Sequence, residues 1–175
     1  ARVFGVDRDR ITPEQRRRAK AVNFGIVYGQ TSHGLSESLH IPRAEAQEMI
    51  DRYFAAYPGV RRFLDELVMS AHERGFAVTM LGRRRPIPEL ASANRNLRNF
   101  GERTAMNHPM QGTAADIMKL AMIAVDRRLI SDGFESRLVL QVHDELVFEA
   151  PRTEVERLSA MAREEMSGVV QLSVP

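Results

Sequence analysis

The amino-acid sequence predicts an α+β fold in which helices predominate. Apolar residues recur at helical spacing over long segments, as they do between residues 44 and 56. Positions 12–15, Thr-Pro-Glu-Gln, are typical of a helix N-terminus, because threonine can cap, proline fits the first turn and glutamine can close a capping box. Short apolar segments on either side of Gly82, and on either side of residues 143–145, indicate two antiparallel hairpins.

The predicted helices end at residues that terminate helices. Gly29 and Gly75 are suited to C-terminal caps, and the helices stop before Pro42 and Pro58. The helices are expected over residues 13–28, 33–40, 44–56, 60–75, 94–107, 110–130 and 153–166. The hairpins are expected over residues 78–88, with arginines at the tip, and 138–148. The segment from Val169 to Pro175 is β-prone, and we expect a strand whose partner is missing.

Composition limits the class of protein. A length of 175 residues suffices for one domain or two small lobes. The fractions of hydrophobic residues (43%) and charged residues (27%) are those of a soluble globular protein. No apolar run approaches the roughly 20 residues that span a bilayer, and residues 1–10 do not resemble a secretory signal. The absence of cysteine excludes disulfides and thiolate metal sites and suits a reducing cytoplasm.

Charge is unevenly distributed, although the net charge is only +2. Residues 1–20 hold seven basic side chains and three acidic ones, and residues 83–103 hold six arginines and two glutamates. Residues 135–165 hold eight carboxylates and four arginines. This pattern suggests a polyanionic partner beside a carboxylate-rich site, but solvated helix faces explain it equally well.

Arg16, Lys20, Phe24 and Tyr28 recur every four residues on the first long helix. Four residues advance a helix by one turn and about 40°, so these side chains form one winding row. Two cations followed by two aromatics match a nucleoside triphosphate, whose tail is polyanionic and whose base is flat. The alternative is an amphipathic helix with its cations in water and its aromatics in the core.

Gly25 and Gly29 lie beside the two aromatics. Glycine inside a helix lowers stability by about 1 kcal/mol, so its presence calls for a reason. We expect the two glycines to leave the backbone open for the close approach of a bulky ligand.

The motif resembles the fingers helix of family A DNA polymerases, the bacterial DNA polymerase I family. The matching residues are Arg16-x-x-x-Lys20-x-x-x-Phe24-Gly25-x-x-Tyr28-Gly29. The resemblance implies that Arg16, Lys20, Phe24 and Tyr28 bind the incoming nucleotide and that Lys20 also takes part in catalysis.

His143-Asp144-Glu145 forms the predicted turn of the second hairpin. Adjacent carboxylates at a tight turn can anchor a hard divalent cation, although such triplets are usually surface turns. The surrounding residues 140–148 resemble the palm motif of the same family. The resemblance implies that Asp144 is one of two aspartates that hold two Mg²⁺ ions, that His143 lies near the primer terminus on DNA, and that Glu145 has an accessory catalytic part.

The second metal-binding aspartate of the family precedes a Tyr-Ser-Gln-Ile-Glu stretch upstream of the fingers helix, and no such stretch precedes Arg16. Asp7 and Asp9 lack that context. Two Mg²⁺ ions need a second carboxylate, so we expect the chain to be an excised piece with an incomplete metal site. The resemblance divides it into part of the fingers, residues 1–93, and the carboxyl-terminal part of the palm, residues 94–175.

Arg103, Asn107 and Gln111 also step by four, across Pro109, which is expected to break or bend the helix. Long polar donors suit the acceptors that every base pair offers in the minor groove. Hydrogen bonding at a helix end is an equally good explanation from the residues alone.

The segment 103–116 resembles the template-primer segment of the family, which implies that Arg103, Asn107 and Gln111 contact DNA. His108 departs from the small residue expected there. The apolar residues that follow are expected in the core: Ile117, Leu120, Ala121 and Val125.

The resemblance implies a DNA-directed DNA polymerase whose partners are template-primer DNA and deoxynucleoside triphosphates, with Mg²⁺ as cofactor. We expect a monomeric parent protein in the cytoplasm, associated with the nucleoid and not with a membrane, and an inactive isolated fragment. One alternative is a phage-type RNA polymerase, in which serine typically follows His-Asp where this chain has Glu145. The other is a nucleic-acid-binding module without catalysis.

Overall fold

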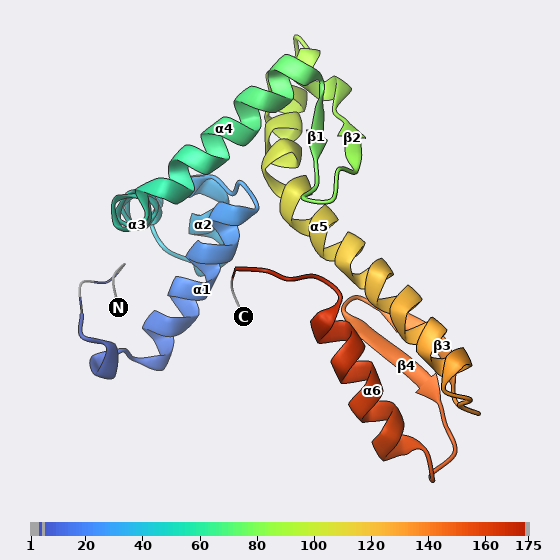
Figure 1. Cartoon of the computed structure of the whole chain (residues 1–175). Coiled ribbons are helices and arrows are strands. Elements are labelled where there is room, and N and C mark those ends of the chain that lie inside the picture. Colours follow the sequence, from blue (N-terminus) through green and yellow to red (C-terminus); the bar gives the residue numbers. More distant parts are fainter. Residues whose placement is uncertain (1–3, 5, 174–175) are drawn as a thin grey trace. The chain divides into compact units, whose positions relative to one another are not determined.

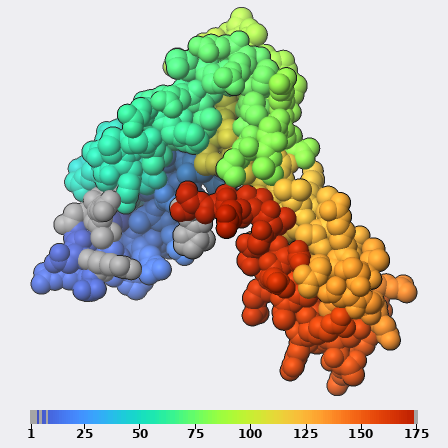
Figure 2. Space-filling view, in the orientation of Figure 1, coloured from blue at the N-terminus to red at the C-terminus, as the bar shows by residue number. Residues whose placement is uncertain are grey.

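The computed structural model describes residue 4 and residues 6–173, and the chain divides into two units between Gly112 and Thr113 (Figure 1). Unit 2 is the yellow-orange to red part of the chain in Figures 1 and 2. Within the described residues, no helix has both the length and the apolar content needed to cross a membrane. The predicted mixture of many helices and short antiparallel hairpins is confirmed.

Unit 1 contains helices α1 (Pro13–Val27), α2 (Ser32–Leu39), α3 (Arg43–Ala56) and α4 (Pro58–Arg74), the strands β1 (Phe76–Val78) and β2 (Arg84–Pro86), and the first part of α5 (Arg95–Ser131). The strands pair in antiparallel register, with Ala77 opposite Arg85. Two short 3₁₀ helices, Arg8–Arg10 and Pro88–Ala91, were not expected from the sequence.

The N-terminus of α1 has the predicted capping box. The Thr12 hydroxyl accepts a hydrogen bond from the Gln15 amide at 3.2 Å, and the Gln15 side-chain oxygen accepts from the Thr12 amide at 3.0 Å. The helix ends at Val27 with Tyr28 as its cap, and Gly29 follows with a φ of +66° that favours glycine. Val22 and Ile26 of α1 pack in the main core of unit 1, so one face of α1 is fixed against α2 and α3. The buried members of that core are Val22, Ile26, Leu35, Ala46, Met49, Ile50, Tyr53 and Leu64.

A second, smaller core joins α4, the hairpin and α5 through Ala71, Ala77, Ile87, Leu90 and Ala105. The hairpin also approaches α5 closely at Gly112, where a Cβ atom would lie 2.6 Å from the Thr79 methyl group. Glycine at position 112 therefore makes this approach sterically possible.

Unit 2 contains the rest of α5, the strands β3 (Arg137–Val142) and β4 (Glu145–Glu149), and helix α6 (Val155–Gly168). The strands form an antiparallel hairpin with a bulge between Leu138 and Leu140. Val125 and Leu129 of α5 pack against α6 and the hairpin. The core residues around them are Phe134, Leu138, Leu146, Phe148, Leu158 and Met161.

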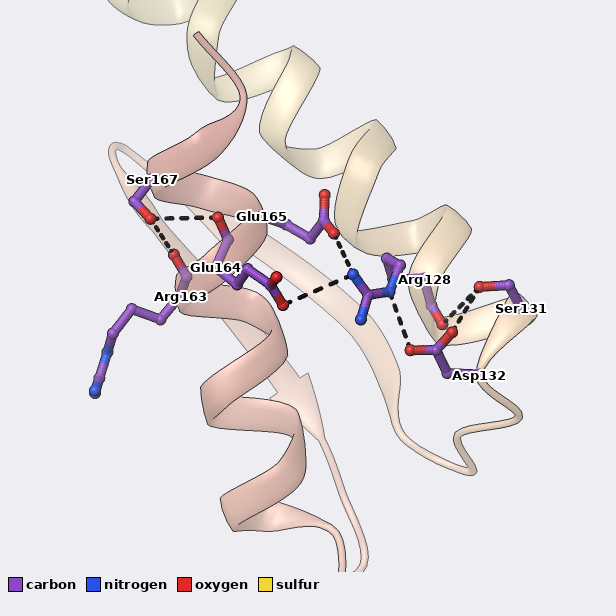
Figure 3. A network of polar contacts seen from close by, with 7 residues as sticks. All are labelled: Arg128, Ser131, Asp132, Arg163, Glu164, Glu165 and Ser167. Atoms are coloured by element: carbon purple, nitrogen blue, oxygen red, sulfur yellow. Dashed lines mark hydrogen bonds and ion pairs between the residues drawn. The ribbon is translucent and has the colours of Figure 1, made fainter. Parts of the chain in front are cut away.

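Polar contacts tie α6 to the end of α5 (Figure 3). Arg128 donates to Asp132 at 3.0 Å and to Glu165 of α6 at 2.6 Å, and its Nη1 lies 3.8 Å from a Glu164 carboxylate oxygen. The Ser131 hydroxyl and Arg128 hold the pKa of Asp132 below its ordinary value. At the other end of α6, the Glu154 carboxylate accepts from the Ser136 hydroxyl at 2.6 Å and from the Ser136 amide at 3.0 Å, and these bonds lower its pKa.

Three expectations are corrected. Pro109 does not end a helix, because α5 continues through it over 37 residues, and one missing N–H removes only one hydrogen bond from so long a helix. Residues 169–173 are not a strand, because β-propensity without a pairing partner does not form a sheet; residues 174 and 175 lie outside the described part. Leu120 is 40% exposed, whereas Ala121 and Val125 are buried as expected.

Candidate functional site

The predicted row on α1 lies on the exposed side of that helix. Arg16 and Lys20 are exposed, and so are Phe24 (56%) and Tyr28 (43%). The two aromatic rings are stacked, with centroids 6.5 Å apart and planes inclined by 16°. The interpretation that placed the aromatics in the core is therefore wrong, because Val22, Gly25 and Ile26 form the buried side of α1.

Ion pairing distinguishes Arg16 from the two arginines that follow it. Arg17 pairs with Glu14 at 2.9 Å, and Arg18 bridges Glu14 and Glu45 of α3 at 3.0 Å each. The two guanidinium groups lower the pKa of Glu14 to about 2. Arg16 and Lys20 form no ion pair with any described residue. Both charges thus remain available to a ligand anion.

The two glycines have a different role from the one expected. A Cβ atom on Gly25 would collide with the side-chain oxygen of Gln30, and one on Gly29 would lie 2.9 Å from Cγ of Arg103. Met106 approaches the same point of Gly29, at 3.2 Å from its sulfur. Side chains of the protein itself fill the space beside both glycines, so the expectation that a ligand approaches there is wrong.

Arg103, Asn107 and Gln111 follow one another along α5 within unit 1. Arg103 is half-buried against Gly29, which brings this row into contact with the end of α1. Asn107 is half-buried, and its side-chain oxygen has no hydrogen-bond partner among the described residues. Gln111 is exposed. Two side chains of the row are thus half-buried and one is exposed, and the buried oxygen of Asn107 lacks a donor.

His108, where the resemblance predicts a smaller residue, packs over Gly112 of the next helical turn. A Cβ atom on Gly112 would lie 2.9 Å from the imidazole Cε1. The missing side chain at position 112 provides the room for the larger residue at position 108.

His143 and Asp144 form the two-residue turn between β3 and β4, and Glu145 begins β4 opposite Val142. The φ of His143 is +53°, an unusual conformation for a residue other than glycine and one that concentrates at functional sites. The Gln141 side chain donates to the His143 carbonyl. All three residues of the triplet are exposed, and none forms an ion pair in the part of the chain that the structure describes.

The two carboxylates at this turn do not make up a metal site by themselves. Oxygen ligands such as Asp144 and Glu145 suit Mg²⁺, but the described residues contain no group of three or more histidine, aspartate or glutamate side chains that could hold a metal. A dication at Asp144 would therefore need ligands from elsewhere. The turn belongs to unit 2, whereas the rows on α1 and α5 belong to unit 1.

Comparison with known proteins defines the class. The whole chain, residues 1–175, matches the sequence family described as DNA polymerase family A. The chain belongs to that family.

Its relatives include bacterial DNA polymerases I. The chain is 51% identical to DNA polymerase I of Bacillus caldotenax over 173 residues, which are 99% of this chain and 20% of that protein. It is 50% identical to DNA polymerase I of Pseudomonas aeruginosa over 175 residues, 100% of this chain and 19% of that protein. The chain thus spans about a fifth of the length of the curated relatives it matches.

A solved structure has the same fold. The polymerase domain of Pol1 from M. smegmatis, in complex with DNA primer-template and dNTP, superposes with a TM-score of 0.93 at 46% identity. The match covers 99% of this chain and 31% of that one.

Proposed function

We propose that the chain is the nucleotide-binding and primer-binding part of a DNA-directed DNA polymerase that adds deoxynucleotides to a primer 3′ end and releases pyrophosphate. The observation that carries the proposal is the exposed row on α1, in which two unpaired cations precede two stacked aromatics. Membership of family A supports it, and so do relatives that are named DNA polymerase I.

Each half of the row on α1 binds a different part of the nucleotide. Arg16 and Lys20 bind the triphosphate, because a guanidinium offers a fork to phosphate oxygens and an ammonium offers a compact charge. Phe24 and Tyr28 present aromatic faces to the sugar and base. Lys20 also stabilises the charge that develops on the phosphates, so that catalysis by these residues is chiefly positioning and electrostatics.

Asp144 holds Mg²⁺ in this proposal, and Glu145 has an accessory part. Mg²⁺ would supply the neutralisation of charge that phosphoryl transfer requires. Two such ions need a second carboxylate anchor, which we assign to a segment of the longer protein outside this chain.

The primer-template is the proposed partner of α5 and of the β3–β4 turn. Arg103, Asn107 and Gln111 donate to minor-groove acceptors, which are shared by all base pairs and allow binding without a preferred sequence. His143 lies beside the primer terminus. The M. smegmatis neighbour was solved with primer-template and dNTP, which supports the same two ligands here. A polymerase of this kind acts on the chromosome, and we place the parent protein at the nucleoid.

The isolated 175-residue chain is expected to show no polymerase activity, because the residues that the structure describes give Asp144 no second anchor. The test measures Mg²⁺-dependent incorporation of labelled nucleotide on a primed template by the chain and by the full-length parent, each free of contaminating polymerase. Activity in the isolated chain would contradict the proposal that its metal site is incomplete. A parent without template-directed activity would contradict the proposed function itself.

In the parent, Lys20→Ala is expected to lower kcat/KM for deoxynucleotides roughly ten- to a hundredfold, since one charge-assisted contact contributes about 1.5–3 kcal/mol. Lys20 is exposed and unpaired, so its loss should not weaken the fold. Lys119→Ala, which removes an exposed lysine from α5, is the matched control. Single-nucleotide incorporation kinetics check the prediction. Unchanged kinetics would show that Lys20 is an ordinary solvated side chain that does not act on the nucleotide.

A further inference from the structure

The turn after α1 contains a side chain lodged between two glycines. A Cβ atom on Gly25 of α1 would collide with the amide oxygen of Gln30, and one on Gly34 of α2 would lie 2.9 Å from Gln30 Cγ and 3.2 Å from its amide nitrogen. The Gln30 side chain therefore occupies the space that ordinary side chains at both positions would fill. It connects α1 with α2 by direct packing.

The backbone at this point forms a Schellman motif. The Gln30 amide donates to the Gly25 carbonyl at 2.7 Å, and the Gly29 amide donates to the Ile26 carbonyl at 2.9 Å. In such motifs the residue in the place of Gln30 commonly makes an apolar contact with the one in the place of Gly25. Here an amide side chain packs on a bare glycine backbone instead. Two glycines, which weaken their helices, thus leave the room that the glutamine side chain occupies.

The same turn bears the two stacked aromatics. Gly25 follows Phe24 directly, and the Tyr28 amide donates to the Phe24 carbonyl at 2.9 Å, two residues before Gln30. The helical turn that carries both rings is therefore the one against which the Gln30 side chain packs.

The turn also borders a cavity. The cavity has a volume of about 200 Å³, and its lining includes Ile26 of α1, Gly29 and Gln30 of the turn that follows, and Met106 of α5. Packing around this turn is therefore incomplete on the side of the cavity.

We propose that Gln30 is a positioning residue that sets the Phe24–Tyr28 pair against the incoming nucleotide. The proposal rests on the nucleotide-binding function of α1 described above. Gln30 acts through the last helical turn and does not itself contact the nucleotide.

The test uses the full-length parent with Gly25→Ala, Gln30→Ala and the double variant. Each single change should raise KM for deoxynucleotides about tenfold while kcat and the Kd for primer-template change less than threefold. The first change pushes the amide away, and the second leaves its space empty. In the double variant at least half of this rise in KM should be reversed, because the new methyl group occupies part of the volume that the glutamine side chain vacated. Gly59→Ala on α4, where a Cβ atom would meet nothing within 4 Å, is the control.

Melting temperatures separate positioning from folding. A Gly25→Ala variant with a lower Tm and an unchanged KM would reduce Gln30 to a packing residue and overturn the proposal. The proposal would also be overturned if the effects of the two single changes on KM simply combined in the double variant, since the two positions would then not act through one contact. A wild-type parent that extends no primer would instead remove the underlying function, and the KM values of the variants would have no meaning.

Discussion

Asp144→Asn in the parent polymerase is expected to lower the rate of primer extension at least about a thousandfold, while the Kd for primer-template stays within about twofold. Removing the charge of a metal anchor sacrifices several kcal/mol of stabilisation of the transition state. Asparagine keeps the size of the side chain. Asp144 is exposed at the turn and forms no ion pair with the described residues, so the fold loses no contact of that kind.

The measurement is single-turnover incorporation over a range of Mg²⁺ concentrations, together with DNA binding in the absence of nucleotide. Asp126→Asn is a matched control, because Asp126 is an exposed aspartate in the same unit. Near-normal turnover of Asp144→Asn at saturating Mg²⁺ would show that Asp144 is not the anchor.

Phe24→Tyr should raise incorporation of 3′-deoxy chain terminators roughly ten- to a hundredfold relative to normal deoxynucleotides. A normal nucleotide carries a 3′-hydroxyl that can hydrogen-bond within its own triphosphate, and a terminator lacks it. A phenylalanine against the sugar offers no replacement, so a polar partner stays unpaired at about 1–3 kcal/mol. A tyrosine hydroxyl restores the missing interaction. The ring of Phe24 is 56% exposed, so the added hydroxyl need not enter the core.

A competition between terminator and normal nucleotide on one primer measures the ratio directly. Phe63→Tyr, which places the same hydroxyl on a 48% exposed phenylalanine of α4, is the control. If the ratio of terminator to normal nucleotide incorporated by Phe24→Tyr equals that of the wild type, Phe24 does not face the sugar. The proposed role of the two aromatics in nucleotide binding would then be unsupported.

Local chemistry made much of the fold predictable. The capping box at Thr12 and the glycine ends at Gly29 and Gly75 depend on neighbouring residues only, and all three were correct. The expected break at Pro109 was wrong, because the rule that proline breaks helices weighs one hydrogen bond and not the length of the helix around it, whereas the expected bend stays a prediction. The segment 169–173 was misjudged because β-propensity expresses how residues fit a sheet, and a sheet needs a partner.

In the candidate site, too, the features that depend on neighbouring residues were predictable and those that depend on distant contacts were not. The spacing of Arg16, Lys20, Phe24 and Tyr28 placed them on one side of α1, but only packing shows that this side faces solvent. The sequence also marked the glycines as unusual without identifying what fills the space beside them. Arg103 is remote in sequence from Gly29, so no local pattern contains that contact. Gln30 could have been found, since a left-handed Gly29 places the next residue over Gly25.

The small sheet of unit 2 has a consequence for any preparation of this chain. It consists of two strands, β3 and β4, so both of its outer edges carry unpaired backbone groups within the described unit. Leu140, Val142 and Val147 on these strands are each more than 40% exposed. Apolar strands with open edges are templates for intermolecular β-pairing. We therefore expect the short chain to aggregate as its concentration rises, and we expect lysine or proline at an outward-facing edge position to reduce this aggregation.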